Sequence, residues 1–272
     1  AIEAGLAGAE YCVVEAGFAS DLGAEKFVDI VARDAGLTVD AALLVVTVRG
    51  LRHHGGAAAD RLDRPDPDAA RRGLANVDAH LAIVRALGIP PVVVLNRYPD
   101  DSPEEREAVR DAMAAAGVPF SESTAFGSGA EGATEVAARA VEATPARGAS
   151  APLYDDESPI PNALEVLVKR VYGGDGADWT DRASAELAEL ARVGEARSPV
   201  CVAKTALSLS DDPSRLGRPR DYRVSVRSVT RSAGAGFSVV YLGEIETMPG
   251  LPRRPLAEGI DLTDDGRIVG LV

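Results

Sequence analysis

The stretch PVVVLNRYPDDSPEEREAVRDAMAAAGVPF, residues 91–120, decides the fold class of this chain. It opens on an uninterrupted apolar run, Pro91–Leu95, which has the length and the valine content of a buried strand. Ser102 and Pro103 then supply a helix N-cap and a first helical residue. A second apolar run, Val118–Phe120, follows the helical pattern closely. Strand, helix and strand in this order predict a parallel βαβ unit.

The same alternation extends over most of the first 145 residues. Asp21 is a second expected N-cap, and a loop containing RGLRHHGG (49–56) precedes one of the helices. Near-continuous Val/Leu runs that alternate with helices are typical of a parallel sheet covered on both faces. We therefore predict an α/β fold, part of a doubly wound parallel sheet, in a first region spanning residues 1–150. The expected strands are Tyr11–Val14, Ala41–Val48, Pro91–Leu95 and Val118–Phe120, and the expected helices are Asp21–Ala35, Asp68–Leu87, Pro103–Ala116 and Gly129–Ala143.

A second region begins after a Pro/Ser/Asp-rich connector at residues 146–162. Helical and strand patterns mix there, and the last expected element is a hairpin with Asp265 and Gly266 at its turn. We predict a smaller mixed α/β region over residues 151–272. Its expected helices cover about 162–172 and 181–193, its strands 200–204, 222–232 and 237–245, and MPGLP (248–252) is expected to form a rigid loop.

The composition excludes several classes of protein. The chain has 272 residues and a formal net charge of −13, which argues against a nucleic-acid surface because such a surface needs a basic footprint. No apolar run approaches the roughly 20 residues of a membrane span. Cys12 and Cys201 lack metal-binding or CxxC spacing, so we expect reduced core thiols and a cytoplasmic location. Because the chain begins without methionine in what reads as the middle of a domain, we interpret it as a C-terminal fragment.

Aromatic residues follow three of the expected strands, although only 4% of the chain is aromatic. Phe18, Tyr98 and Phe126 each stand just past a strand, among small or polar neighbours. Ligands of open parallel sheets bind outside the carboxyl ends of the strands. Rings at such a crevice can stack on a flat heteroaromatic ligand. The alternative, which the sequence leaves open for each ring, is packing between a loop and a helix.

Polar residues share these strand ends. Glu15 closes the first expected strand, where an acid in nucleotide-handling α/β proteins holds Mg²⁺ directly or through water, or else serves as a helix-cap partner. Asn96 and Arg97 follow the third strand and offer amide and guanidinium donors to a purine edge or to phosphate and carboxylate oxygens.

Glycines gather after the fourth expected strand. Gly127, Gly129 and Gly132 surround a helix start, where free backbone amides favour an anion, although the same glycines also suit a simple strand-to-helix turn. The GxxxxGK[ST] phosphate loop is absent from the sequence. These residues alone therefore cannot form a complete nucleotidase of the phosphate-loop class.

Long motifs in the same order along the whole chain point to one family. The chain resembles the C-terminal half of the formate–tetrahydrofolate ligases, also called 10-formyltetrahydrofolate synthetases. The motifs that carry the resemblance are VVEAGFASDLGAEKF (13–27), VTVRGLRHHGG (46–56), GLANVDAH (73–80), VVVLNRYPDD (92–101), VYGGDGADW (171–179), PVCVAKTALSLSDDP (199–213), GRPRDYRVSVRSV (217–229), SAGAGF (232–237) and GEIETMPGLPRRP (243–255).

The resemblance implies a reaction in one-carbon metabolism. MgATP, formate and tetrahydrofolate would give 10-formyltetrahydrofolate, ADP and phosphate through formyl phosphate. It further implies a homotetramer, a possible monovalent cation, and a P-loop NTPase-like sheet whose phosphate loop lies in the N-terminal half that is missing here.

The resemblance also assigns roles to residues. It puts a folate-stacking clamp at Tyr98 and Phe126, and Phe18 near the reacting groups. The predicted catalytic set consists of Glu15 and Arg97, from the strand ends, together with Phe18 and Lys204. Lys204 is one of only three lysines in a chain rich in arginine, which suggests that arginine would not serve at this position. The alternative is that this lysine is retained by chance. The chain departs from the family pattern at Ser128, Ala206 and Leu207, which bears on the fine contacts of those loops.

Two other functions stay open from the residues alone. One is a non-catalytic nucleotide- or folate-binding module. The other is an ATP-dependent ligase of the dethiobiotin-synthetase type, which shares the acid after a buried strand. The motifs between Tyr172 and Pro255 argue against the second.

Overall fold

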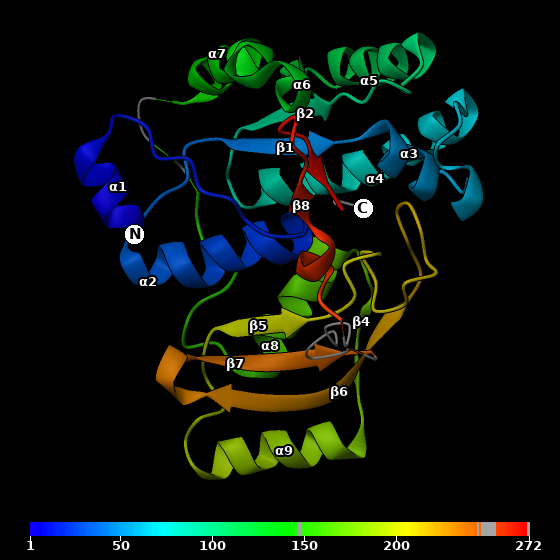
Figure 1. Ribbon diagram of the computed structural model, residues 1–272. Coiled ribbons are helices and arrows are strands. Elements are labelled where there is room, and N and C mark those ends of the chain that lie inside the picture. Colours follow the sequence, from blue (N-terminus) through cyan, green and yellow to red (C-terminus); the bar gives the residue numbers. More distant parts are fainter. Residues whose placement is uncertain (146–147, 149, 244, 246–253, 271–272) are drawn as a thin grey trace.

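The computed structural model describes residues 1–145, 148, 150–243, 245 and 254–270 (Figure 1). This part of the chain forms two larger sheets and a small hairpin. The first sheet contains β1 (Ala42–Val46), β2 (Pro91–Asn96) and β3 (Phe120–Ser123) in the order β1-β2-β3; the second contains β4 (Gly176–Trp179), β5 (Val200–Ala203), β6 (Arg223–Ser232) and β7 (Phe237–Leu242) in the order β4-β6-β7-β5; β8 (Asp261–Leu262) pairs with β9 (Ile268–Val269).

The first sheet is parallel throughout, as the repeated strand–helix pattern predicts. Val93 of the central strand pairs with Leu44 on one side and with Phe120 on the other. β3 begins at Phe120, two residues later than expected, because Val118 still takes part in the cap of the preceding helix: its backbone N–H donates to Met113 O at 2.9 Å. The α/β class predicted for this region is confirmed.

Helices cover both faces of the first sheet. On one face Val93 lies in a cluster with apolar residues of three helices. On the other face Val92 and Val94 pack against Val136. The helices of the first face are α3 (Val48–His54), α4 (Pro67–Ala86) and α5 (Pro103–Ala115), and the helix of the second face is α7 (Thr134–Ala143) (Figure 1).

The start of α5 confirms the predicted cap. The Ser102 hydroxyl accepts a hydrogen bond from Glu105 N at 3.3 Å, and the Glu105 carboxylate accepts one from Ser102 N at 3.1 Å, which forms a capping box. Glu105 also accepts from Nε and Nη2 of Arg52, at 2.7 Å each, and both side chains are fully buried. Burial raises the pKa of Glu105, but the hydrogen bonds from Arg52 and Ser102 outweigh it and lower the pKa to about 2.

A helix over residues 20–35 lies between the two sheets (Figure 1). It matches the expected Asp21–Ala35 in extent, but two of its segments are π-helical, η1 (Ser20–Ala24) and η2 (Phe27–Ala32), before it closes as α2 (Arg33–Ala35). Val28 belongs to the largest apolar core, which also contains Ile83 and residues of the second region. This helix therefore joins the two regions.

The second region is mixed α and β, as predicted. β6 and β7 are antiparallel, whereas β4 runs parallel to β6 and β5 runs parallel to β7. The sequence did not predict β4, because GADW is too short and too polar to show strand alternation. The helices that pack here are α8 (Ile160–Leu167), η5 (Val168–Tyr172) and α9 (Asp181–Arg192), close to the two expected helices.

The strand expected at Tyr11–Val14 is wrong. These residues form irregular chain after α1 (Ile2–Gly8), and Val13 is 88% exposed. A parallel strand is stable only when a neighbour satisfies its backbone groups, and no strand pairs with this stretch in the part of the chain that the structure describes. The apolar run therefore has strand composition without a strand partner.

The loop expected at RGLRHHGG is also wrong, because α3 occupies most of it. Thr47 caps this helix by accepting a hydrogen bond from Gly50 N at 3.0 Å. The helix then crosses α4 so closely that a Cβ at Gly73 would lie 2.1 Å from Leu51 O. Of the glycines that suggested a loop, Gly55 serves this packing, because a Cβ there would collide with the backbone of Ala69 on α4.

Asp21 does not cap its helix, contrary to expectation. The N-cap is Ala19, with no side-chain hydrogen bond. The Asp21 carboxylate is buried and pairs instead with Lys204 from the second region, at 2.7 Å. The local sequence predicted a helix cap, but the Asp21 carboxylate instead forms an ion pair with a lysine distant in the sequence.

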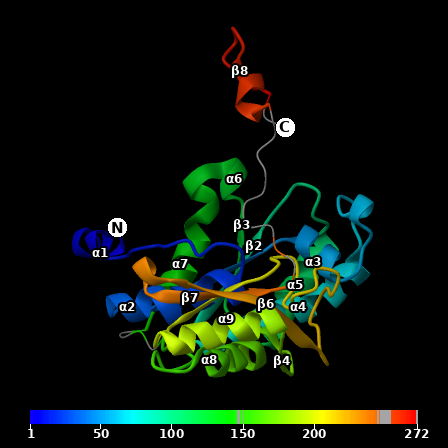
Figure 2. The same cartoon turned by 90° about the horizontal axis from the view of Figure 1, so that it is seen from below.

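The largest apolar core crosses the predicted boundary near residue 150, since it combines Ile83 and Leu87 with Val226 and Val240. The predicted hairpin is present as β8 and β9, and it stands apart from both sheets in Figure 2. The MPGLP loop lies outside the described residues. The short elements are η3 (Ala59–Arg61), α6 (Ala125–Ser128), η4 (Gly129–Ala133), η6 (Ala233–Ala235) and η7 (Leu256–Gly259).

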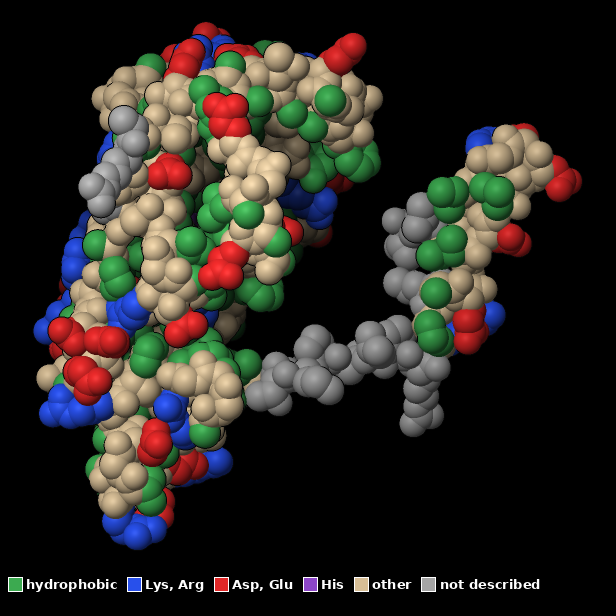
Figure 3. Space-filling model, turned by 90° about the vertical axis from the view of Figure 1, so that its left-hand side faces the viewer, with side chains coloured by type: hydrophobic (Ala, Val, Ile, Leu, Met, Phe, Trp, Pro, Cys, Tyr) green, Lys and Arg blue, Asp and Glu red, His purple; other side chains and the backbone are tan. Residues whose placement is uncertain are grey.

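The distribution of surface charge and the apolar character of the helices concern nucleic-acid and membrane partners. The face in Figure 3 carries acidic and basic side chains interspersed, without a broad basic area. Within the described residues, no helix combines the length and apolar character needed to cross a membrane. Cys12 and Cys201 are free thiols, and both are half-buried.

Candidate functional site

The carboxyl ends of β2 and β3 lie together and bring two groups of predicted site residues to one edge of the first sheet. Asn96 is in register with Ser123, and Arg97 N donates a hydrogen bond to Ser123 O at 3.0 Å. The chain after each strand therefore leaves the sheet from neighbouring positions. Asn96 is half-buried and Arg97 is exposed, so both are open to a ligand at this edge.

The two predicted stacking rings follow these strand ends directly. Tyr98 is 46% exposed, and its backbone N–H donates to the Asp101 carboxylate at 2.8 Å, which fixes the turn after β2. Phe126 lies on the short helix α6 after β3 and is 96% exposed. Exposing so much of an aromatic ring to water is unfavourable unless a ligand or another protein surface covers it. Both rings therefore have free surface at the edge where ligands of parallel sheets bind.

The predicted glycines form the turn between α6 and α7. Gly132 O accepts a hydrogen bond from Thr124 N at 3.1 Å, and a Cβ at Gly132 would lie 2.5 Å from Thr124 C, so this glycine permits a close backbone contact. Gly129 takes a left-handed φ of 58°. Gly127 is part of α6. Turn geometry explains Gly129 and Gly132, and their anion-binding role stays a prediction.

A second group of residues surrounds a cavity of about 300 Å³ between the regions. Phe18, Lys26 and Lys204 line it, together with small and apolar residues from 17–23 and 202–203. Phe18 is 86% exposed and has a φ of 69°, a left-handed conformation that is unusual for an aromatic residue. The predicted Phe18 and Lys204 thus come together at this cavity.

The ammonium group of Lys204 contacts three oxygen acceptors within the protein. It pairs with the Asp21 carboxylate at 2.7 Å and donates to Ser208 O at 2.5 Å and to Thr205 O at 3.1 Å. The ammonium also lies 5.2 Å from the centre of the Tyr172 ring. Burial lowers the pKa of Lys204, which the Asp21 charge opposes. Because an ammonium has three donors, this geometry favours a positioning role over direct contact with a substrate.

Glu15 is exposed, in the irregular stretch that was expected to be a strand. Within the described residues, no cluster of three or more His, Cys, Asp or Glu side chains could hold a metal ion. A single exposed carboxylate can still contact hydrated Mg²⁺ carried by a nucleotide. Glu15 therefore stays a predicted metal contact through water.

Sequence reasoning missed a buried acidic pair behind the cavity. Glu25 and Asp29 are both fully buried, one helical turn apart, and Lys26 Nζ lies 3.3 Å from the Glu25 carboxylate. Burial raises the pKa of Glu25 to about 8, and the neighbouring Asp29 adds to the shift while Lys26 opposes it. Two acids four residues apart on the apolar side of a helix were the available signal.

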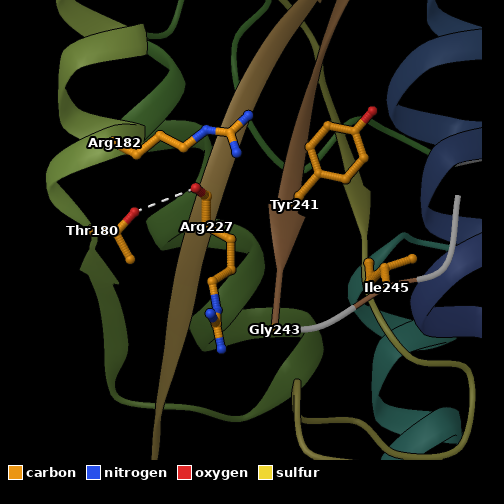
Figure 4. Close-up of a pocket in the computed structure, with 6 residues that line it drawn as sticks. All are labelled: Thr180, Arg182, Arg227, Tyr241, Gly243 and Ile245. Carbon is orange, nitrogen blue, oxygen red and sulfur yellow. Dashed lines mark hydrogen bonds between the residues drawn. The ribbon is translucent and has the colours of Figure 1, made fainter.

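A larger cavity of about 470 Å³ lies against the second sheet (Figure 4). Thr180, Arg182, Arg227 and Tyr241 line it, and Thr180 Oγ1 donates to Arg227 O at 3.3 Å. The guanidinium groups of Arg182 and Arg227 point away from each other in Figure 4, and Arg182 pairs with Glu186 at 2.8 Å. These groups do not converge on one ligand atom, so this cavity is not the candidate site.

Fold and site define a class of protein: an α/β protein whose exposed rings and polar groups gather at the carboxyl edge of a parallel sheet, where such proteins bind small ligands. The sequence model of the formate–tetrahydrofolate ligase family matches residues 1–272. The chain belongs to this family.

Individual relatives agree with the family match. The formate–tetrahydrofolate ligase of Thermus thermophilus is 45% identical over 263 residues, which cover 97% of this chain and 48% of the relative. Those of Myxococcus xanthus and a Nocardioides species are 44% and 46% identical, and the matches cover 98% and 100% of this chain and 49% of each relative. The chain thus spans about half the length of the curated relatives it matches.

Proposed function

We propose that this chain forms the folate-binding part of an ATP-dependent ligase that joins formate to tetrahydrofolate and releases ADP and phosphate. The observation that carries the proposal is the pair of exposed rings, Tyr98 and Phe126, which follow two neighbouring strands of one sheet edge. Family membership supplies the reaction, and the rings supply surface for a flat pterin between them.

The proposed chemistry has two steps. A formate oxygen attacks the γ-phosphorus of ATP, which releases ADP and leaves formyl phosphate. The amine of tetrahydrofolate then attacks the formyl carbon and displaces phosphate. Both steps depend on positioning charged reactants and on stabilising the charge that develops.

This chain contributes groups suited to positioning. The Arg97 guanidinium and the Asn96 amide can donate to carboxylate or phosphate oxygens at the sheet edge. Gly127 lies in α6, and Gly129 and Gly132 lie in the turn before α7, where backbone amides can face an anion. Phe18 supplies an apolar wall beside the reacting groups, which keeps water from formyl phosphate.

The exposed edge of the first sheet is consistent with a larger P-loop NTPase-like domain, in which a further part of the protein supplies the phosphate loop. β1 has no strand on its outer edge within the described residues. Val45 of β1 is 60% exposed on the face where α7 packs on β2 and β3. An apolar strand surface of this kind favours additional packing. MgATP, a monovalent cation and a homotetramer belong to that whole in this proposal.

Removing either ring is expected to weaken the binding of tetrahydrofolate. Tyr98→Ala and Phe126→Ala each remove one stacking surface, at an expected cost of roughly 1–3 kcal/mol, or about 5- to 150-fold in Kd. Anaerobic calorimetric titration with tetrahydrofolate measures this change. Tyr11→Ala is the matched control, since Tyr11 is exposed to a similar extent outside this edge and its loss should leave Kd unchanged. Parent-like affinity in both ring variants contradicts the clamp.

A non-catalytic folate-binding module is the second candidate. It is favoured by the internal use of all three Lys204 donors. Formate- and folate-dependent release of ADP distinguishes the two functions. The ligase is expected to release ADP when a phosphate-loop half from a relative is co-expressed with this chain, whereas the module binds folate without turnover.

A further inference from the structure

Phe18 is held in a conformation that its own backbone does not favour. Its φ of 69° is strained for a non-glycine residue, and its ring gains little from packing because it is 86% exposed. Strain of this kind persists only where neighbouring structure imposes it. The residues that impose it can be identified from the contacts on either side.

The chain before Phe18 is held by backbone contact. A Cβ at Gly23 would lie 2.2 Å from Gly17 O and 2.7 Å from Ala16 C, so the first turn of the helix rests directly on the backbone that leads to Phe18. This close contact limits where Gly17 can lie, but by itself it does not fix the helix relative to the rest of the protein.

Two polar contacts hold the chain after Phe18, and the second of them is buried. Ser20 Oγ lies 2.7 Å from Nδ1 of His80, on α4 of the first region. The next residue, Asp21, pairs at 2.7 Å with Lys204, which follows β5 of the second region. Within three residues of Phe18 the chain is thus tied to both sheets.

The geometry points to Asp21 and Lys204 as positioning residues: we propose that their ion pair holds the Phe18 ring at the mouth of the cavity, for the ligand of the proposed function. The inference that the ring is held rests on contacts alone, and its use in binding rests on the proposed function.

The properties of the pair fit positioning better than stabilisation. The side chains of Asp21 and Lys204 are 5% and 0% exposed. A buried ion pair often adds little stability over well-packed apolar residues, because removing both charges from water is costly. What it does provide is one defined geometry, because the Lys204 ammonium has a single arrangement that serves the carboxylate and two carbonyls together. The forked guanidinium of arginine would not fit these three acceptors.

Fluorine NMR of the full chain, labelled with 4-fluorophenylalanine, tests the inference without any ligand. The chain has only five phenylalanines, so a Phe18→Leu variant assigns the Phe18 resonance. Asp21→Asn is expected to shift this resonance toward the position of a mobile ring and to leave the other four in place. The double variant Asp21→Asn/Lys204→Met should show the same shift, and it leaves no buried charge unpaired, so it guards against loss of folding.

A matched control breaks another ion pair. Glu122→Gln removes the partner of Arg106, a pair at 3.0 Å in the first region, and should leave the Phe18 resonance unchanged. A Phe18 resonance that stays at its parental position in both Asp21 variants overturns the inference.

Ligand binding then separates the inference from the proposed function. Phe18→Ala and Asp21→Asn are each expected to weaken tetrahydrofolate binding about 10-fold, and the combination should cost no more than Phe18→Ala alone, because one residue acts through the other. Additive losses would make the pair a general structural element and overturn its action through Phe18. If the parent fails to bind tetrahydrofolate while the resonance still depends on Asp21, the proposed function fails and the positioning stands.

Discussion

Replacing Arg52 by methionine is expected to lower the free energy of unfolding by about 3–5 kcal/mol. The change leaves the Glu105 carboxylate fully buried without its two 2.7 Å hydrogen bonds from the guanidinium. The remaining donors, which are Asp66 N, Ser102 N and the Ser102 hydroxyl, satisfy only part of that charge. Urea unfolding at pH 7, followed by circular dichroism, measures the loss.

The pH dependence of this loss follows from the pKa of Glu105. It is about 2 in the folded protein against 4.5 in the unfolded chain, so the contribution is fully present above pH 4.5 and is lost as the pH falls toward 2. The deficit of the Arg52→Met variant should shrink over the same window. Arg71→Met is the control, because the pair of Arg71 with Glu104 is exposed and its loss should have a much smaller effect. Equal losses in the two variants would contradict a special role for the buried pair.

Replacing Glu25 by glutamine is expected to stabilise the protein, increasingly so as the pH rises. The pKa of Glu25 is about 8 in the folded protein, because burial disfavours its charge, and 4.5 in the unfolded chain. Between these values the folded state keeps a proton that the unfolded state releases, so the stability of the parent falls as the pH rises. Glutamine does not titrate, and the variant escapes this fall.

The expected gain is close to zero near pH 4.5 and reaches about 5 kcal/mol above pH 8, from the difference between the two pKa values. Denaturant unfolding at pH 5, 6.5 and 8 measures it. Glu107→Gln removes an exposed carboxylate and serves as the control with no such trend. A gain that is the same at all three pH values would show that glutamine improves packing rather than removing a buried titration.

Much of the fold could be predicted from the sequence because its signals are local. The cap and the helix that begin at Ser102 and Pro103 depend on residues close together in the sequence. The apolar run at Pro91–Leu95 has the length and composition of a buried strand, which its own residues show. The hairpin around Gly266 is of the same kind. The predicted elements that failed depended on distant residues. Tyr11–Val14 has strand composition but lacks a strand partner within the described residues. The glycines near His53 suggested a loop, because the close contact of Gly55 with Ala69 of α4 is visible only in the fold.

The candidate site divides in the same way. The positions of Tyr98 and Phe126 after neighbouring strands could be predicted, because parallel strands end at one edge. The buried groups near Phe18 could not. Asp21 had the sequence signature of a cap, and only the fold brings Lys204 within 2.7 Å of it. Glu25 had no signature beyond its spacing from Asp29.

The sequence by itself determined the α/β class, most helices and strands of the described residues, and the membership of the chain in its family. Hydrophobic periodicity and helix capping depend on residues close together in the sequence, so they can be recognised without knowledge of the rest of the fold. The tertiary structure alone decided which charges meet in the core. A buried charge is tolerated only where a partner from elsewhere in the chain compensates for lost water, and that partner is chosen by the fold.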